Sequence, residues 1–403
     1  MKSKDRKIFL TIFFTLASGL ILFLLFFKPA IKDKFISGDF DNLKPAMSIE
    51  KPEVHEKGDI EPEKPLADPP EAIKALYATS TSAGNPAKID NFIKLIKKAN
   101  LNAIVIDIKD YSGYVFYDSG IEDVAKYKAE KIMIPKINTL IKKLHDENIY
   151  VIARVVVFQD PRLAAARPEL AVKNRITGGV WRDNLNLAWL DPGSQDVWDY
   201  IVKISQDAAS RGFDEINYDY IRFPSDGRLS AMSFPFFDKK KITKEEGIKE
   251  FFTYLREKMG SVRISADVFG LTTSAKDDLG IGQIIENAYQ NFDAVAPMVY
   301  PSHYAVGFLG FAEPARHPYE VVKYAIEKAV IKLEEYNSTK EVFGPREKEL
   351  SNAKIRPWIQ AFNMGDIYTV DKIKIQIKAS DEAGGTGWML WNPANNYSFL
   401  NNF

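Results

Sequence analysis

The chain has 403 residues, of which 46% are hydrophobic, which is enough for one large globular domain or two ordinary ones. Its 54 basic residues balance 54 acidic residues, so bulk charge favours neither nucleic acid as a partner nor disorder of the whole chain. Cysteine is absent, which excludes thiol catalysis, cysteine metal ligands and disulfide bonds.

The first feature along the chain is an uncharged apolar segment, Ile8–Phe27, whose length matches one helical span of a bilayer. Basic residues precede it at positions 2, 4, 6 and 7, which places the N-terminus in the cytoplasm by the positive-inside rule. We expect residues 1–27 to be a cytoplasmic stub and a single-pass transmembrane anchor in the cell membrane, with the rest of the chain extracytoplasmic. A cleaved signal peptide is the alternative, although no Ala-x-Ala-like cleavage site follows before Lys28.

Residues 28–72 are rich in proline and charged residues and show no sustained hydrophobic period, which is typical of a linker. From residue 73 to the C-terminus, short β-rich runs alternate with longer amphipathic segments. The strand candidates are Lys74–Ser80, Ala103–Lys109, Tyr150–Phe158, Glu215–Phe223, Arg263–Gly270, Ala294–Tyr300, Lys354–Phe362 and Gly387–Asn392.

Eight such repeats predict that residues 73–403 form one (β/α)8 TIM barrel, an α/β fold. Helix candidates fall between the strands, for example at Ser194–Arg211 and Thr243–Met259, and each ends next to a glycine. A doubly wound open sheet is the alternative. The segment after the first strand candidate, STSAGN at residues 80–85, lacks the Gly-rich phosphate fingerprint of that fold.

Strand parity predicts which polar side chains face the barrel interior, because alternate residues of a strand point to opposite faces. Isoleucines at 104, 106 and 108 form one apolar face, which leaves Asp107 and Lys109 pointing inward. The same reasoning turns Asp219 and Asp267 inward on two neighbouring strands. Parity also predicts inward-pointing side chains for Arg154, Tyr300, Gln360 and Trp391.

A single aspartate at a strand end caps a turn or pairs with arginine more often than it catalyses. Asp219 and Asp267 together are harder to explain as packing, because every buried charge needs compensation. Arg222 follows Asp219 closely, and His303 lies just beyond a strand end. Four tryptophans could form a platform for sugar rings, namely Trp181, Trp189, Trp388 and Trp391, although parity turns Trp388 outward.

Three motifs carry a resemblance to a known family: GFDEINYDYIRFPSDG at residues 212–227, ISADVFG at 264–270 and FDAVAPMVYPSHY at 292–304. The chain resembles the bacterial putative glycoside hydrolase domain family of the domain-of-unknown-function type, whose TIM barrel is distantly similar to those of amylase-like enzymes. The resemblance covers about residues 73–392. It implies that Asp219, in the motif DYIRFP, is the nucleophile. The fifth-strand acid/base of amylase-like enzymes is a glutamate, and Asp267 stands in the matching place.

We therefore predict a membrane-anchored glycoside hydrolase of a poly- or oligosaccharide, with no cofactor and no metal. In a retaining mechanism Asp219 would be the nucleophile, held ionised by Arg222 or Arg154, and Asp267 the acid/base. The predicted substrate-binding residues are Asp107, Lys109, Arg154, Arg222, Tyr300, His303, Gln360 and Trp391.

Two alternatives belong to other classes. The first is a non-catalytic glycan-binding TIM barrel of the cell surface, which the shorter aspartate at position 267 favours. The second is a polysaccharide deacetylase, but that chemistry usually requires a His-rich metal site, and the chain has only four histidines and no H-x-x-x-H motif.

Overall fold

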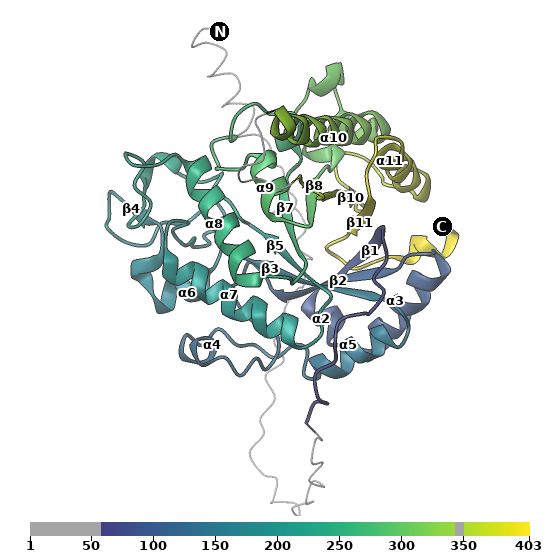
Figure 1. The fold of residues 1–403 in the computed structure, drawn as a ribbon, viewed down its shortest axis with the longest axis horizontal. Helices are drawn as coiled ribbons and strands as arrows, with labels where there is room; N and C mark the ends of the chain where they lie inside the picture. Colours follow the sequence, from purple (N-terminus) through teal and green to yellow (C-terminus); the bar gives the residue numbers. More distant parts are fainter. Residues whose placement is uncertain (1–57, 343–349) are drawn as a thin grey trace, which may run out of the picture. The chain divides into compact units, whose positions relative to one another are not determined.

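The computed structural model describes residues 58–342 and 350–403. Within them the main sheet is parallel, in the order β10-β11-β1-β2-β3-β5-β7-β8-β9, and β10 also pairs with β8, which closes the sheet into a TIM barrel (Figure 1). Its strands are β1 (Ile73–Ala78), β2 (Ala103–Lys109), β3 (Tyr150–Val156), β5 (Glu215–Asp219), β7 (Ile264–Phe269), β8 (Ala294–Met298), β9 (Lys354–Ile355), β10 (Trp358–Gln360) and β11 (Gly387–Trp391).

One predicted strand, Lys354–Phe362, is interrupted, so that β9 and β10 share a single position in the barrel. The break contains Pro357, which has no N–H to donate to a neighbouring strand. The predicted strands at Tyr150–Phe158 and Glu215–Phe223 also end earlier, at Val156 and Asp219. The eight-strand prediction is nevertheless confirmed.

Helices surround the barrel (Figure 1). The longer ones cover its outer face and follow the strands in turn, and short ones lie in the loops. They are α2 (Ser80–Ala83), α3 (Pro86–Lys98), α4 (Glu122–Lys126), α5 (Ile137–His145), α6 (Pro161–Ala166), α7 (Gln195–Ser210), α8 (Lys244–Met259), α9 (Ile285–Asn291), α10 (Pro318–Val342) and α11 (Val370–Glu382). Helix α8 begins with a capping box, in which Thr243 and Glu246 each satisfy a backbone N–H of the other.

The apolar core has two parts, which follow the strand parity. Ile104, Ile106 and Ile108 belong to the larger cluster between the barrel and its helices, together with the outward-facing Trp388. Val105 belongs to the smaller cluster inside the barrel. The parity prediction is confirmed for these positions.

The amino-terminal end of the barrel interior is closed by polar contacts around Glu215. Its carboxylate forms an ion pair with Arg356 and accepts hydrogen bonds from Ser265 Oγ at 2.5 Å and Tyr150 Oη at 3.2 Å. The charge of Glu215 is therefore compensated within the fold, which indicates a structural role.

Part of the predicted linker packs on the barrel. The Leu66 backbone N–H donates to Asp214 Oδ1 at 2.6 Å, and the Leu66 side chain packs against the interior cluster. Asn138 Nδ2 donates to the Ile60 carbonyl at 2.7 Å. Residues 60–72 therefore form part of the compact unit that runs from Ile60 to Phe403.

The predicted membrane segment, Ile8–Phe27, lies outside the described residues. In the part of the chain that the structure describes, no helix is long and apolar enough to cross a membrane.

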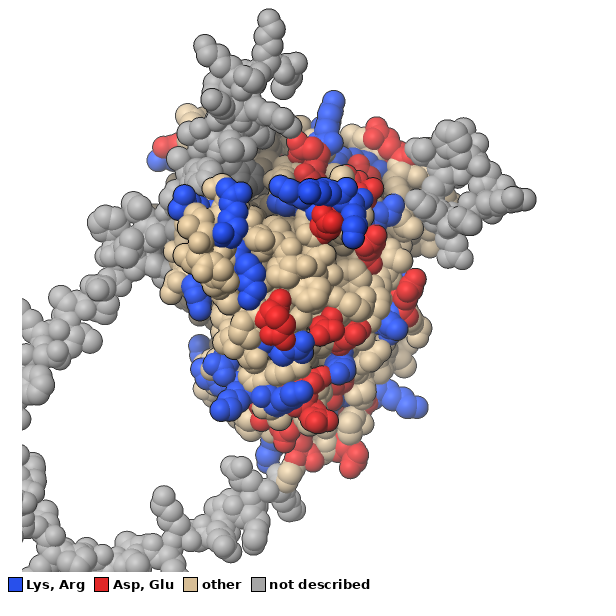
Figure 2. Space-filling view, turned by 90° about the vertical axis from the view of Figure 1, so that its left-hand side faces the viewer, with Lys and Arg blue, Asp and Glu red and all other residues tan. Residues whose placement is uncertain are grey.

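The two long loops at Gln159–Gly193 and Ser225–Ile242 pair with each other. Their short strands β4 (Lys173–Asn174) and β6 (Met232–Ser233) form an antiparallel ribbon near the carboxyl ends of β3 and β5. On the face shown in Figure 2, acidic and basic side chains are interspersed, and neither sign covers the surface. This mixture agrees with the balanced charge of the sequence.

Candidate active site

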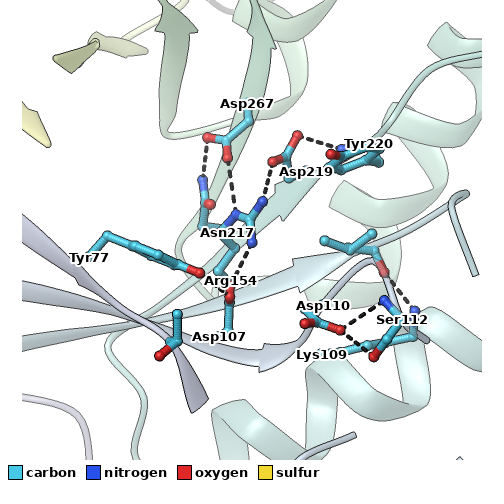
Figure 3. Close-up of polar contacts among 12 residues, drawn as sticks. Tyr77, Asp107, Lys109, Asp110, Ser112, Arg154, Asn217, Asp219, Tyr220 and Asp267 are labelled. Atoms are coloured by element: carbon cyan, nitrogen blue, oxygen red, sulfur yellow. Dashed lines mark hydrogen bonds and ion pairs between the residues drawn. The ribbon is translucent and has the colours of Figure 1, made fainter. Parts of the chain in front are cut away.

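Arg154, on β3, is the centre of the polar cluster at the carboxyl ends of the strands (Figure 3). Its Nη1 donates to Asp107 Oδ1 at 2.5 Å, and its Nη2 donates to Asp219 Oδ2 at 2.5 Å. Its Nε lies 3.8 Å from Asp267 Oδ2, which is an ion-pair contact longer than a hydrogen bond. One guanidinium group therefore joins three carboxyl groups that come from three other strands.

The strand register explains this convergence. Asp107 of β2 is paired with Arg154 of β3, and Arg154 is paired with Asn217 of β5. Asn217 is paired in turn with Ser265 of β7, so Asp219 and Asp267 lie one pleat further along their strands. Because alternate residues share a face, all these polar side chains enter the interior near the same end of the barrel.

Asp219 ends its strand in a strained turn. Tyr220 has a φ of 54°, in the left-handed region that large side chains rarely adopt, and its N–H donates to Asp219 Oδ1 at 2.6 Å. Such conformations persist only where the surroundings impose them, and they are concentrated at functional sites. The turn holds the Asp219 carboxylate between Tyr220 and Arg154.

Asp267 is almost completely buried, with 1% of its surface exposed. Its Oδ1 accepts hydrogen bonds from Asn217 Nδ2 at 2.9 Å and Trp358 Nε1 at 2.8 Å. Burial, followed by the charge of Asp219, raises the pKa of Asp267 to about 8, although Arg154 and the two hydrogen bonds act in the opposite direction. Asp267 therefore favours the protonated form at neutral pH.

Asp107 is enclosed between Arg154 and Tyr77, whose hydroxyl donates to Asp107 Oδ2. Burial raises the pKa of Asp107, and its contacts with Arg154 and Tyr77 partly offset this effect. The Tyr77 ring stacks on Trp391 with a centroid separation of 4.1 Å, and the Arg154 guanidinium lies 5.1 Å from the Trp391 ring. Asp107 and Trp391 thus belong to the cluster, and both contact protein groups within it.

Lys109 lies away from this cluster, in an ion pair of its own. Its Nζ is 2.9 Å from Asp160 Oδ2 and donates to the Val156 carbonyl at 2.8 Å, and neither Lys109 nor Asp160 is exposed. We had expected Lys109 to bind substrate hydroxyl groups, but no part of its side chain is accessible. Its contacts instead tie β2 to the loop that follows β3.

Gln360 is also fully buried and bonded to the backbone. Its Oε1 accepts from the Ser302 N–H at 3.1 Å, and its Nε2 donates to the Phe362 carbonyl at 3.1 Å. It therefore fixes the loop after β8 against the end of β10. This loop carries Tyr300 and His303, so Gln360 can affect the site through them.

Tyr300 and His303 lie at the rim next to Phe362. The Tyr300 ring is 5.2 Å from the His303 ring and 5.7 Å from the Phe362 ring, between centroids. Burial, followed by the negative charges of Asp267 and Asp219, raises the pKa of Tyr300. The His303 side chain is exposed, and its Nδ1 lies 3.0 Å from Ser302 Oγ. His303 is thus the more accessible of the two.

Arg222 does not contact Asp219, so Arg154 alone supplies the direct ion pair that we expected from either arginine. Trp181 and Trp189 are buried, and their indole N–H groups donate to the Arg228 carbonyl and to Asp183. Neither ring is available as a sugar platform.

Three members of the cluster were not named as site residues from the sequence: Tyr77, Asn217 and Trp358. The signal that could have found them is the same parity. Asn217 shares its strand face with Asp219, and Trp358 shares its strand face with Gln360. They were missed because an aromatic or amide side chain does not by itself suggest a charged site.

In residues 58–342 and 350–403, no group of three or more His, Asp or Glu side chains is arranged to hold a metal ion. A cavity of about 660 Å³ lies at the opposite, amino-terminal end of the barrel, next to Glu215 and Arg356. Since Asp219 and Asp267 lie at the carboxyl end, where barrel enzymes build their sites, we place the candidate active site there.

The fold and the clustered carboxyl groups define the class of glycoside-hydrolase-like (β/α)8 barrels. Residues 75–397 match the family model described as "Putative glycosyl hydrolase domain" (DUF4015), and the chain belongs to this family. Among curated proteins, none matches the chain significantly.

Solved structures resemble the chain as well. The PgaB (BpsB) glycoside hydrolase domain from Bordetella bronchiseptica is 12% identical, with a TM-score of 0.54 over 82% of this chain and 97% of that one. A hypothetical protein from Ruminiclostridium thermocellum is 41% identical over 51% of this chain and 98% of its own, with a TM-score of 0.45. The likeness to the Bordetella domain supports the barrel fold.

Proposed function

We propose that the protein hydrolyses glycosidic bonds in a poly- or oligosaccharide, with Asp219 and Asp267 as the catalytic pair. The observation that carries this proposal is that both carboxyl groups, from adjacent strands, meet the guanidinium group of Arg154 at the carboxyl end of the barrel. Glycoside hydrolysis usually requires two carboxyl groups, one ionised and one protonated.

Their environments differ in the required sense. Asp219 accepts hydrogen bonds from Arg154 Nη2 and from the Tyr220 N–H. Asp267 has a raised pKa because it is buried next to the negative charge of Asp219. Since Asn217 and Trp358 both donate to Oδ1, the proton of Asp267 belongs on Oδ2.

In the retaining mechanism that we propose, an Asp219 oxygen attacks the anomeric carbon while the bond to the leaving oxygen breaks. The Asp267 proton passes to that oxygen, and the departing sugar leaves as an alcohol. Water then attacks the anomeric carbon, gives a proton to the Asp267 carboxylate and releases Asp219. Tyr300 and His303 at the rim would bind hydroxyl groups of the sugar.

The proposal includes the position of the enzyme in the cell. The apolar segment Ile8–Phe27 and the basic residues before it favour a single-pass anchor with the barrel outside the cytoplasm. Extracytoplasmic glycans would then be the accessible substrates.

The test is reducing-end release by the full chain in mild detergent from a panel of oligosaccharides. Asp219→Asn removes the charged nucleophile but keeps its shape, so we expect turnover to fall by at least about a thousandfold. Its far-UV circular dichroism should match that of the control Asp371→Asn, which changes an exposed aspartate of α11, so that the loss of turnover is not a loss of fold. Unchanged turnover in Asp219→Asn would refute this role.

A second function, non-catalytic glycan binding, is favoured by one observation. With 1% of its surface exposed, Asp267 is less accessible than a proton donor to a sugar oxygen would ordinarily be. Binding of an oligosaccharide without release of reducing ends, at any pH from about 4 to about 9, would favour a glycan-binding protein over an enzyme.

A further inference from the structure

Arg222 is a buried arginine without an acidic partner. It is 9% exposed, and its Nη1 donates to two neutral acceptors, the Phe223 carbonyl and Ser225 Oγ, each at 3.2 Å. No described Asp or Glu forms an ion pair with it, whereas the buried Arg154 and Arg356 both pair with carboxylates. A guanidinium group has five N–H donors, so much of the binding capacity of Arg222 is uncommitted.

Aromatic rings surround this guanidinium group. Its central carbon lies 4.9 Å from the Trp189 ring, 5.2 Å from the Tyr220 ring and 4.6 Å from the Phe269 ring, measured to the centroids. Cation–π contacts of this kind hold the plane of the group without neutralising its charge. Burial lowers the pKa of Arg222.

The three acidic side chains whose charge reaches Arg222 are engaged elsewhere. Asp219 accepts hydrogen bonds from Arg154 Nη2 and the Tyr220 N–H. Asp183 Oδ2 accepts from Gln159 Nε2 and Trp189 Nε1, and Asp226 Oδ1 accepts from the Asn184 N–H. Both raise the pKa of Arg222 only through their charge at a distance. A direct anionic partner for Arg222 is thus missing among the described residues.

The position of Arg222 connects it to the candidate active site. It follows Asp219 by three residues, and its neighbour Phe269 follows Asp267 by two. It therefore lies between the ends of the two strands that carry the proposed catalytic pair. Tyr220 and Phe269 are half-buried, so this region borders the accessible part of the barrel end.

We propose that the substrate is an anionic glycan, and that Arg222 binds the carboxylate of one of its uronic acid residues. The inference rests on the proposed function, because it assigns the substrate class of the same site. The planar guanidinium matches a carboxylate with two parallel hydrogen bonds, and the aromatic rings hold it in one orientation.

Charge also explains why such a residue would be needed. The ionised Asp219 repels a carboxylate that enters the site, and Arg154 is already shared among three carboxyl groups. A second, uncommitted arginine offsets this repulsion for an acidic sugar. A neutral sugar offers Arg222 only uncharged hydroxyl acceptors, which form weaker hydrogen bonds with a guanidinium group than a carboxylate does, and this gives discrimination against it.

The test measures binding by calorimetry, with the full chain carrying Asp219→Asn so that ligands are not consumed. The probes are oligogalacturonate, hyaluronan and alginate oligosaccharides, each compared with its methyl-esterified form, which has the same sugars without the charge. We expect at least one free acid to bind about ten- to a hundredfold more tightly than its ester. This comparison needs no change at Arg222.

Arg222→Gln added to Asp219→Asn should abolish the preference for the free acid. Arg222→Lys in the same background should keep part of it, because lysine has the positive charge but lacks the planar pair of N–H donors. Arg228→Gln changes an exposed arginine of the same loop and should leave the preference intact. Equal affinity for acids and esters, or a preference that survives Arg222→Gln in a folded protein, would overturn the inference. Arg222-dependent binding of sulfated glycans alone would overturn the assignment to a carboxylate.

The two proposals fail separately. Hydrolysis of neutral glycans that is insensitive to Arg222→Gln would leave the hydrolase and remove the anionic substrate. Arg222-dependent binding of a uronate oligosaccharide that the unmodified chain never cleaves would keep the binding assignment and remove the hydrolase.

Discussion

At the scale of single residues, the cluster depends on the way one arginine distributes its contacts. Arg154 is within ion-pair distance of Asp107, Asp219 and Asp267, but only the first two accept hydrogen bonds from it. Asp267 is the most deeply buried of the three, and its burial, followed by the charge of Asp219, raises its pKa. Two aspartates can therefore have different proposed roles, Asp219 as the nucleophile and Asp267 as the acid, because their contacts with Arg154 differ.

This difference predicts how stability depends on pH. The unfolded chain releases the Asp267 proton near pH 4, whereas the folded protein keeps it to about pH 8. Because the folded state binds more protons in this window, the contribution is full below about pH 4 and is lost as the pH rises through about 8. Asp267→Asn should remove this part of the slope.

Urea denaturation of both proteins at several pH values measures the effect. The free energy of unfolding of the unmodified chain should fall more steeply with rising pH than that of Asp267→Asn. Because proton donation requires protonated Asp267, we also expect kcat/KM to decline as the pH rises above about 8. Parallel stability curves would show that Asp267 titrates normally.

At the scale of elements, the loop after β8 is held by a buried amide. Gln360 accepts from Ser302 and donates to Phe362, so it connects the two segments whose side chains, Tyr300, His303 and Phe362, meet at the rim. Gln360→Ala should leave the Ser302 N–H and the Phe362 carbonyl unpaired, at a cost of about 1–3 kcal/mol in stability. The loosened loop should raise KM more than it lowers kcat.

Steady-state kinetics and denaturation of Gln360→Ala check this, with Gln290→Ala, an exposed glutamine, as the control. A KM equal to that of the control, in a folded variant, would show that the loop does not contact substrate.

The elements also show which parts of the site could be predicted from the sequence. Local alternation was sufficient to orient Asp107, Asp219, Asp267 and Arg154, because parity is a property of each strand alone. Side chains beyond the strand ends depend on contacts distant in sequence. Lys109 was assigned to substrate because its partner, Asp160, lies in a loop whose path no periodic pattern reveals.

The unusual backbone conformation of Tyr220 could not be predicted from the sequence either. The pattern predicted a strand through Phe223, whereas the left-handed conformation of Tyr220 ends it at Asp219 and redirects the chain towards Arg222. A tyrosine in this conformation contradicts its intrinsic preference, so only the tertiary structure shows it.

At the scale of the whole molecule, the folded unit includes residues 60–72, which their composition predicts to be part of a linker. Residues 60–72 are rich in proline and charge, yet Leu66 packs into the amino-terminal end of the interior and bonds to Asp214. A chain that begins at Ile60 should therefore unfold at the same temperature as the full chain. One that begins at Ile73 should lose about 2–4 kcal/mol, from one half-buried leucine and the hydrogen bonds of this segment.

Thermal and urea unfolding of the two shortened chains distinguish these cases. Equal stabilities would mean that residues 60–72 add nothing to the folded unit.

The central claim is that Asp219 is the nucleophile of a retaining glycoside hydrolase. The most direct test treats the full chain with an activated 2-deoxy-2-fluoro glycoside of a sugar that it cleaves, then maps the label by peptide mass spectrometry. Our account predicts stoichiometric loss of activity with the sugar attached to Asp219, and no label in Asp219→Asn. A label on another residue, or no label together with a product of inverted anomeric configuration, would contradict it.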